Sequence, residues 1–284
     1  MTLSRRPGPS SRVRVHEYAD AQLQAREDRL ATEEPLEIRL SWPGAPPRRL
    51  SVTMRTPGHD FALAAGFLLT EGLVGSAGQL QTVAYCTDET LAPEQEFNVV
   101  TVDLRGPPLR VPAERYDGPG AATSACGVCG TQSIDDVLAR TGSVQPDEAT
   151  LTVPAGVLLE LPDRLRDAQK VFDRTGGLHA AGLFEADGTP VVVREDIGRH
   201  NAVDKVLGEL LLAAAPVPPV LCVSGRIGFE IVQKAVAAGI HVLLAVGAPS
   251  SLAVDLATRS GLTTLGFVRG GRFVIYSAPE RVGV

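Results

Sequence analysis

The sequence predicts an α/β protein, α+β overall, in which a smaller strand-rich domain precedes a larger α/β domain. Residues 34–111 alternate apolar and polar residues at period two, and only one helical segment interrupts them. From residue 178 onward strand-like and helix-like segments alternate, which is typical of a mainly parallel sheet covered by helices. With 284 residues, 44% of them hydrophobic, the chain can bury the core of one large or two smaller domains.

The N-terminal domain is expected over residues 31–115. It follows residues 1–30, which we expect to form a disordered tail because arginines there lie among Ser, Pro and Gly without an apolar core. The expected elements are strands at Leu36–Leu40 and Asn98–Leu104 and a helix at Phe61–Leu69, which follows Thr56-Pro57-Gly58-His59-Asp60 and stops before Gly72.

Residues 116–132 are expected to form a flexible loop, because this stretch is rich in glycine, proline and alanine. The loop carries Cys126 and Cys129, two of the four cysteines, bracketed by glycines. The following Ser133-Ile134-Asp135-Asp136 is a capping pattern and predicts a helix start. The positive end of that helix would favour a thiolate at Cys129.

Two thiols at this spacing allow a disulfide, half of a metal site, or a persulfide carrier. The N-terminal segment lacks the apolar body of a secretion signal, so we expect a cytoplasmic protein with reduced thiols. In that compartment a close cysteine pair is more plausibly catalytic or metal-binding than structural. Cys86 and Cys222 each stand alone, and we expect both to be small buried apolar residues.

The α/β domain is expected over residues 133–284. Its expected elements, in order, are strands Leu178–Phe184 and Val191–Arg194, helix Asn201–Leu212, strand Val220–Val223, helix Phe229–Ala238, strand Ile240–Val246, helix Ser251–Thr258, and strands Thr263–Val268 and Arg272–Tyr276. Ligands in open α/β sheets gather at the carboxyl ends of strands, where helices begin.

Three turns of this domain are candidates for binding an anion. Ser224-Gly225-Arg226 and Ala248-Pro249-Ser250-Ser251 each follow a strand and offer hydroxyls at a helix start, although ordinary helix capping explains either turn taken alone. Phe267-Val268-Arg269-Gly270-Gly271-Arg272 places two guanidiniums around a glycine pair, which suits a planar or phosphorylated anion. A plain hairpin turn also explains the glycine pair.

Ionisable residues crowd the strand-to-helix junction Glu195–Lys205. On the expected helix His200 and Asp204 share a face, as do Asn201 and Lys205. A solvated, salt-bridged helix start accounts for the charges, but it does not explain why glycine and histidine meet carboxylates at the end of a strand. His179, at the entry to an apolar strand, is either a satisfied core histidine or a ligand-binding one.

Several functional classes fit the sequence poorly. A net charge of −6 and a pI near 5.5 argue against nucleic-acid binding. The longest apolar runs, around 210–215 and 240–245, fall far short of the ~20 residues that cross a bilayer. His179 with the two loop cysteines resembles the zinc ligand set of nucleobase deaminases, but Ala181 stands where their glutamate would be and the order of ligands is reversed.

Taken together, the motifs resemble the FdhD (NarQ) family of formate dehydrogenase accessory proteins, from about residue 30 to residue 280. The motifs that carry this resemblance are Thr56–Asp60 with Gly66–Gly72, Cys126-Gly127-Val128-Cys129-Gly130, Glu195–Lys205, Ser224-Gly225-Arg226 with Phe229-Glu230, and Ala248–Ala253. Each motif alone is modest, and their shared order makes coincidence improbable.

The resemblance implies a sulfur carrier that takes persulfide sulfur from a cysteine desulfurase. It would pass this sulfur to the bis-molybdopterin guanine dinucleotide form of the molybdenum cofactor, which formate dehydrogenase needs. This cofactor would be cargo, and we expect no permanently bound cofactor or metal. The resemblance also implies a three-layer C-terminal domain like that of cytidine deaminase, Cys126 as the persulfide cysteine, Cys129 as its helper, and residues 267–272 as part of the cofactor site.

With the strand-end turns included, the expected cofactor contacts are Ser224, Gly225, Arg226, Ser250, His200, Asn201 and residues 267–272. Two alternatives remain open. The protein would be a cofactor-binding chaperone if the cysteines only shaped the loop, or a zinc-site protein on a deaminase-like scaffold. The expected partners are the desulfurase and formate dehydrogenase, and a homodimer is compatible with the sequence.

Overall fold

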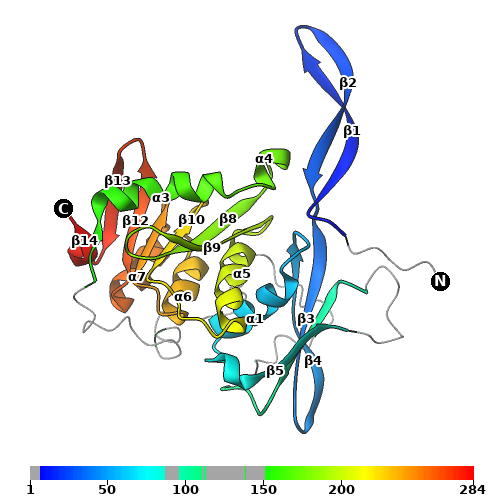
Figure 1. The fold of residues 1–284 in the computed structure, drawn as a ribbon, viewed down its shortest axis with the longest axis vertical. Helices are drawn as coiled ribbons and strands as arrows, with labels where there is room; N and C mark the ends of the chain where they lie inside the picture. The colour runs from blue at the N-terminus through cyan, green and yellow to red at the C-terminus, as the bar shows by residue number, and fades with distance from the viewer. Residues whose placement is uncertain (1–6, 87–95, 111, 113–137, 139–150) are drawn as a thin grey trace.

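The structure is a computed structural model that describes residues 7–86, 96–110, 112, 138 and 151–284 (Figure 1). Its larger sheet has six strands in the order β13-β12-β11-β10-β8-β9, and a four-stranded sheet has the order β4-β3-β6-β5. The mixed α/β class predicted from the sequence is confirmed. The expected cysteine loop, with Cys126 and Cys129, and the helix start at Ser133 lie outside the described residues.

The N-terminal segment differs from the expected disordered tail. Strands β1 (Ser10–Ala19) and β2 (Gln22–Ala31) pair antiparallel and extend away from the rest of the molecule (Figure 1). Asp20 and Ala21 join them with φ angles of 51° and 59°, the backbone of a two-residue hairpin turn that follows the strand twist. Val13 and Val15 alternate with polar residues, which is the period-two pattern of a strand. The expectation of a disordered tail relied on the polar composition and overlooked this pattern.

The smaller sheet and its helix form a second core. Its elements are β3 (Glu34–Trp42), β4 (Ala45–Arg55), α1 (Asp60–Thr70), the 3-10 turn η1 (Ala77–Gln79), β5 (Leu80–Tyr85) and β6 (Val99–Leu104). Apolar residues at period two on β3 (Leu36, Ile38 and Leu40) point into this core, where they meet Leu63 and Leu68 of α1. Leu211 of α5 also joins this core, so the two parts of the chain share buried apolar surface.

The larger sheet is mixed rather than mainly parallel. The elements of this domain are β7 (Val153–Pro154), α3 (Ala155–Asp167), α4 (Phe172–Thr175), β8 (His179–Phe184), β9 (Pro190–Asp196), α5 (Arg199–Leu212), β10 (Val220–Val223), α6 (Phe229–Ala237), β11 (Val242–Ala245), α7 (Ser251–Ser260), β12 (Thr263–Arg269), β13 (Arg272–Ser277), η5 (Pro279–Arg281) and β14 (Val282–Gly283). Strands β7 and β14 form a separate two-stranded sheet. Among the described strands of the six-stranded sheet, only the pairs β10–β11 and β11–β12 are parallel, and β8, β9 and β13 run antiparallel to their neighbours.

Helices cover both faces of this sheet. Leu221 and Val223 of β10 pack toward α5, α6 and α7, whereas Val220 and Cys222 pack with α3 on the other face. Figure 1 shows α3 crossing one side of the sheet and α5 to α7 lying on the other. The domain therefore has three layers, and its likeness to cytidine deaminase stays a prediction.

Helices α1 and α5 join the two cores through glycine. A Cβ atom on Gly66 would lie 1.9 Å from the carbonyl oxygen of Asp204, and one on Gly208 would lie 1.8 Å from that of Ala62. Because only a residue without a side chain allows this approach, the two backbones pack at close range. The contact holds the smaller sheet against the larger domain.

Candidate functional site

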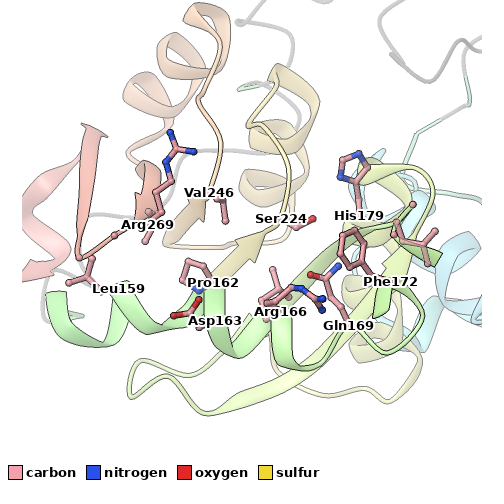
Figure 2. Close-up of a pocket in the computed structure, with 17 residues that line it drawn as sticks. Leu159, Pro162, Asp163, Arg166, Gln169, Phe172, His179, Ser224, Val246 and Arg269 are labelled. Carbon is pink, nitrogen blue, oxygen red and sulfur yellow. The ribbon is translucent and has the colours of Figure 1, made fainter. Parts of the chain in front are cut away.

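A pocket of about 860 Å³ opens at the carboxyl ends of three neighbouring strands (Figure 2). Ser224 follows β10, Val246 follows β11 and Arg269 ends β12, while helix α3 forms the opposite wall. This is where open α/β sheets bind ligands, because their strands end beside the starts of helices. We call it the strand-end pocket, and its polar lining residues are Asp163, Arg166, Gln169, His179, Ser224 and Arg269.

The glycine pair at the end of β12 forms a hairpin turn and also borders a pocket, which are the two roles that the sequence suggested for it. Gly270 and Gly271 have φ angles of 60° and 72°, and Arg269 pairs with Arg272, so they form a two-residue hairpin turn. Val268, Arg269 and both glycines also line the strand-end pocket. Arg272 is not among the lining residues, and neither is Phe267.

Phe267 adopts an unusual backbone conformation next to the pocket. Its φ angle is 55°, in the left-handed region that non-glycine residues rarely occupy, and it lies at an irregularity in the β12–β13 pairing. Its amide N–H donates to the carbonyl of Gly247 at 3.1 Å, which ties the bulge to the turn after β11. Bulges of this kind redirect neighbouring side chains, and here Val268 and Arg269 line the pocket.

His179 and the Ser224 turn lie at the start of β8, beside the carboxyl end of β10. The Ser224 hydroxyl oxygen accepts from the Ala180 amide at 2.9 Å, so it satisfies the backbone where the two strands separate. A Cβ on Gly225 would lie 3.3 Å from Nδ1 of His179, so glycine lets the imidazole sit against this turn. Burial and the positive charge of Arg199 lower the pKa of His179, which keeps the ring neutral at pH 7.

The wall formed by α3 and α4 was not anticipated from the sequence. The Arg166 guanidinium lies 4.7 Å from the centroid of the Phe172 ring and 2.6 Å from a carboxylate oxygen of Asp173. The spacing of apolar residues in α3 marks a helix, but no pattern shows that its exposed edge borders a pocket. A buried glutamine such as Gln169 also gives no sequence signal.

Glu195, from the ionisable junction, orders this wall. Its two carboxylate oxygens accept from the amides of Val171 and Phe172 at 2.9 and 2.7 Å, at the first turn of α4. A carboxylate at a helix start is stabilised by the free N–H groups there. Glu195 thus fixes the position of Phe172, a pocket residue, without lining the pocket itself.

The rest of the junction binds the two domains together. Lys205 contacts Asp196 at 2.6 Å and donates to the carbonyl of Thr56 at 2.9 Å. The Asn201 amide donates to the carbonyl of Met54 at 2.8 Å and to Asp196 at 3.0 Å. His200 lies 3.4 Å from Glu230. His200 and Asn201, expected at the cofactor, are not among the residues that line the strand-end pocket.

The two strand-end turns also fill structural roles. Ser250 is the N-cap of α7, and its hydroxyl accepts from the amide of Ala253 at 3.3 Å. Helix α6 begins at Phe229 after Gly228, as expected, so the Ser224 hydroxyl precedes the helix and does not cap it. Ser224 lines the strand-end pocket, whereas Gly225, Arg226 and Ser250 are not among its lining residues.

The two lone cysteines differ from each other. Cys222 is fully buried, as predicted, and burial raises the pKa of its thiol. Cys86 is only partly buried, and its sulfur lies 3.8 Å from Nη1 of Arg39, so the prediction of a buried residue is wrong there. Cys126 and Cys129 lie outside the described residues, so their distance from the strand-end pocket is not given by the structure.

The described ranges contain neither a metal site nor a membrane-spanning helix. In these ranges no group of three or more His, Cys, Asp or Glu side chains is placed to hold a metal ion. Within the same part of the chain, no helix combines the length and the apolar character that spanning a membrane requires.

The strand-end pocket combines an apolar interior with cationic groups. Its apolar lining residues are Leu159, Pro162, Leu165, Phe172, Leu178, Val246 and Val268. Figure 2 shows Arg269 toward one end and His179 and Phe172 toward the other, with Arg166 on the α3 side. Arg166 is already paired with Asp173, and Arg269 adds a second guanidinium at the other end, which favours a ligand that carries negative charge there beside a flat apolar body.

Comparison with known proteins places this architecture in a family. The profile of the FdhD/NarQ family matches residues 31–283. Relatives named "Sulfur carrier protein FdhD" from Streptomyces coelicolor and Mycobacterium tuberculosis are 50% and 46% identical over 279 and 278 residues, covering 97% and 95% of this chain and 96% and 97% of theirs.

A crystal structure from Desulfotalea psychrophila, titled as a candidate formate dehydrogenase accessory protein, has the same fold. It superposes with a TM-score of 0.69 at 23% identity, covering 96% of this chain and 99% of that one. The family match spans both sheets and the strand-end pocket, so the chain belongs to the FdhD/NarQ family.

Proposed function

We propose that this protein is a sulfur carrier that takes persulfide sulfur from a cysteine desulfurase and delivers it to the bis-molybdopterin guanine dinucleotide molybdenum cofactor used by formate dehydrogenase. The names of the relatives support sulfur carriage in general. The cofactor has two nucleotide tails with phosphates and flat ring systems. The strand-end pocket, with Arg166 and Arg269 around an apolar interior, is the observation that best supports binding of such cargo.

The sulfur step is a thiol–persulfide exchange. The Cys126 thiolate attacks the outer sulfur of the desulfurase persulfide, a new S–S bond forms, and the donor cysteine leaves as a thiolate. Attack of the Cys129 thiolate on the Cys126 persulfide then releases sulfide and leaves a Cys126–Cys129 disulfide. Reduction of this disulfide by a thiol reductant restores both cysteines.

Labelled sulfur tests the assignment of the two cysteines. Wild type, Cys126→Ala and Cys129→Ala are incubated with desulfurase and labelled cysteine, and intact mass and label are measured. We expect one added sulfur on wild type and on Cys129→Ala, with slower onward transfer for the latter, and none on Cys126→Ala. Full labelling of Cys126→Ala would overturn the assignment.

A cofactor-binding chaperone is the second candidate, because the described residues of the strand-end pocket suit an anionic, flat-ringed cargo whatever the two cysteines do. The double variant Cys126→Ala/Cys129→Ala separates the two functions. If the protein carries sulfur, this variant fails to activate formate dehydrogenase although it still binds cofactor. If activation survives the loss of both thiols, the chaperone is the correct function.

A further inference from the structure

Gln169 is a largely buried polar residue whose side-chain amide makes no hydrogen bond to the residues that the structure describes. Its residue surface is 3% exposed, and it lines the strand-end pocket. Its backbone is held at both ends, because its N–H donates to the Arg166 carbonyl and its carbonyl accepts from the Asp173 amide, each at 3.1 Å. Among the described residues its side-chain amide makes no hydrogen bond. The amide atoms are not among the buried polar atoms that lack a partner in the described part of the chain, so they border the open space of the pocket and are available to a ligand.

Two further polar groups border the same space. The Ser224 oxygen accepts from Ala180, which leaves its hydroxyl proton to donate elsewhere. His179 is neutral, so its ring offers one donor and one acceptor. Figure 2 shows Gln169 beside Phe172 and near Ser224, on the side of the pocket away from Arg269. The polar groups thus gather at one end of the pocket, next to an aromatic ring.

We infer that Gln169 is the specificity-determining residue of the strand-end pocket, where its amide reads the edge of a flat heterocycle that carries a ring carbonyl beside a ring N–H. This inference rests on the proposed function, because guanine and pterin rings both present that edge. A primary amide pairs with it through two parallel hydrogen bonds, since it donates to the carbonyl and accepts from the N–H. The Ser224 hydroxyl donor favours a carbonyl over an amino group at the same place.

The rest of the pocket suits the rest of such a ligand. Arg166 covers one face of the Phe172 ring and is paired with Asp173, so the other ring face is the one left for stacking, and Arg269 at the far end is the guanidinium that can hold phosphate. Glu195 maintains the geometry because it anchors Phe172, three residues from Gln169. An adenine ring carries an amino group in place of the carbonyl and no ring N–H, so it lacks the edge that the amide and hydroxyl recognise together.

Calorimetric titration of the full-length protein tests the assignment. The probes are guanosine, inosine and adenosine 5′-diphosphates, which share their phosphates, and 6-hydroxymethylpterin, which presents the same edge without phosphate. We expect guanosine and inosine diphosphates to bind alike and more tightly than adenosine diphosphate. Gln169→Leu should weaken the first two by about tenfold or more, the usual effect of one lost bidentate pair, and bring their affinities close to that of adenosine diphosphate.

Matched variants separate recognition from misfolding. Gln81→Leu makes the same change at an exposed position on β5 and should leave all affinities unchanged. Gln169→Ala should reproduce the loss, and both Gln169 variants should keep the wild-type melting temperature. Loss of affinity for either the guanine or the pterin probe supports the inference, and the probe affected identifies which ring of the cargo occupies this end. Unchanged affinity for every probe overturns it.

Sulfur loading distinguishes this inference from the proposed function. Gln169→Leu should still accept labelled sulfur from the desulfurase, because the change is in the pocket and not in the cysteine pair. If wild type accepts no sulfur, the proposed function fails while the titrations still decide the role of Gln169. If loading is normal and Gln169→Leu binds every probe like wild type, only the inference on Gln169 fails.

Discussion

His179 shows how the surroundings of a single residue set its charge. Burial contributes most to lowering its pKa, and the positive charge of Arg199 contributes next. The pKa of His59 is also lowered, first by burial and then by Arg194. Both rings are therefore uncharged at neutral pH in the folded protein.

These two histidines predict a pH dependence of stability. With the folded pKa below the ordinary value of 6.5, the unfolded chain takes up protons first as the pH falls. Their stabilising contribution is therefore complete above pH 6.5 and is lost as the pH falls through the folded pKa. We expect His179→Gln to make the fall of the unfolding free energy between pH 7 and pH 5 shallower, as measured by urea titration.

The matched variant His59→Gln should reduce the same slope by an independent amount, because the two histidines lie at different places in the fold. The double variant should then show the sum of the two effects. A His179→Gln protein with the same pH slope as wild type would contradict the lowered pKa.

Residue roles were predictable from the sequence where local chemistry decides them. Ser250 caps a helix and Cys222 is buried in a strand, as their neighbours in the chain indicate. Gln169 and Arg166 were not found, because the pocket brings α3 and the turn after it together with strand ends distant in the sequence. Asn201 was assigned to the cofactor, but its buried amide bonds Met54 and Asp196. Sequence alone does not distinguish these two uses of a polar side chain.

At the scale of elements, the contact between α1 and α5 depends on two glycines. Gly66→Ala places a Cβ 1.9 Å from the carbonyl oxygen of Asp204, and the backbone there cannot yield without moving the helix. We expect this substitution to lower the free energy of unfolding by about 3 kcal/mol or more, at the upper end of overpacking effects. Gly208→Ala should act similarly. Urea denaturation measures both.

Gly156→Ala is the matched control, since a Cβ there meets nothing within 4 Å and the residue also lies in a helix. It should change the free energy of unfolding by no more than about 1 kcal/mol, in the stabilising direction. If Gly66→Ala behaved like Gly156→Ala, the close approach of α1 and α5 would be wrong.

A buried ion pair connects α5, α6 and α1. Lys234 Nζ lies 2.8 Å from both carboxylate oxygens of Asp204, which also accepts from the Thr70 hydroxyl at 2.9 Å. Burial raises the pKa of Asp204, and Lys234 opposes this shift. Lys234→Met should destabilise the protein by about 3–5 kcal/mol, because it leaves a carboxylate buried without its cation.

Adding Asp204→Asn to Lys234→Met should restore most of this stability, since the uncompensated charge is then gone. Thermal unfolding of the single and double variants measures the recovery. Lys170→Met, at an exposed lysine, is the control and should change stability by less than about 0.5 kcal/mol. A double variant no more stable than Lys234→Met would show that the carboxylate charge is not the cause.

From residue 178 to residue 277 the elements of the larger domain were predictable to within a few residues, but helix α3 before them and the direction of the strands were not. Strand β10 is apolar at all four positions, and such a buried strand has the same pattern in a parallel or an antiparallel pair. Its neighbour β8 is antiparallel, and this direction is determined by packing between segments that are distant in the sequence. The β1–β2 hairpin was missed for the opposite reason, since its charged and mostly exposed residues resemble a tail.

At the scale of the whole molecule, the described domains share their stabilising contacts. Helix α1 contributes to the core of the smaller sheet and packs against α5 of the larger domain. Lys205 of α5 binds the Thr56 carbonyl between β4 and α1, and Leu211 of α5 is buried in the smaller core. Neither core is complete without residues of the other part.

This sharing predicts that the two parts unfold together. The one tryptophan of the chain, Trp42, packs against the smaller core, so its fluorescence reports on that part. Circular dichroism at helical wavelengths reports mainly on α3, α5, α6 and α7 of the larger domain. We expect both signals to change at the same urea concentration and with the same slope, because separating the parts would expose Leu211 and the buried charges of Lys205 and Asp196. Gly66→Ala, which weakens the α1–α5 contact, should pull the two transitions apart so that tryptophan fluorescence changes first. Two separate transitions in the wild-type protein would show instead that the smaller sheet folds independently. The packing of α1 against α5 and the hydrogen bond from Lys205 to the Thr56 carbonyl would then contribute little to coupling the two parts.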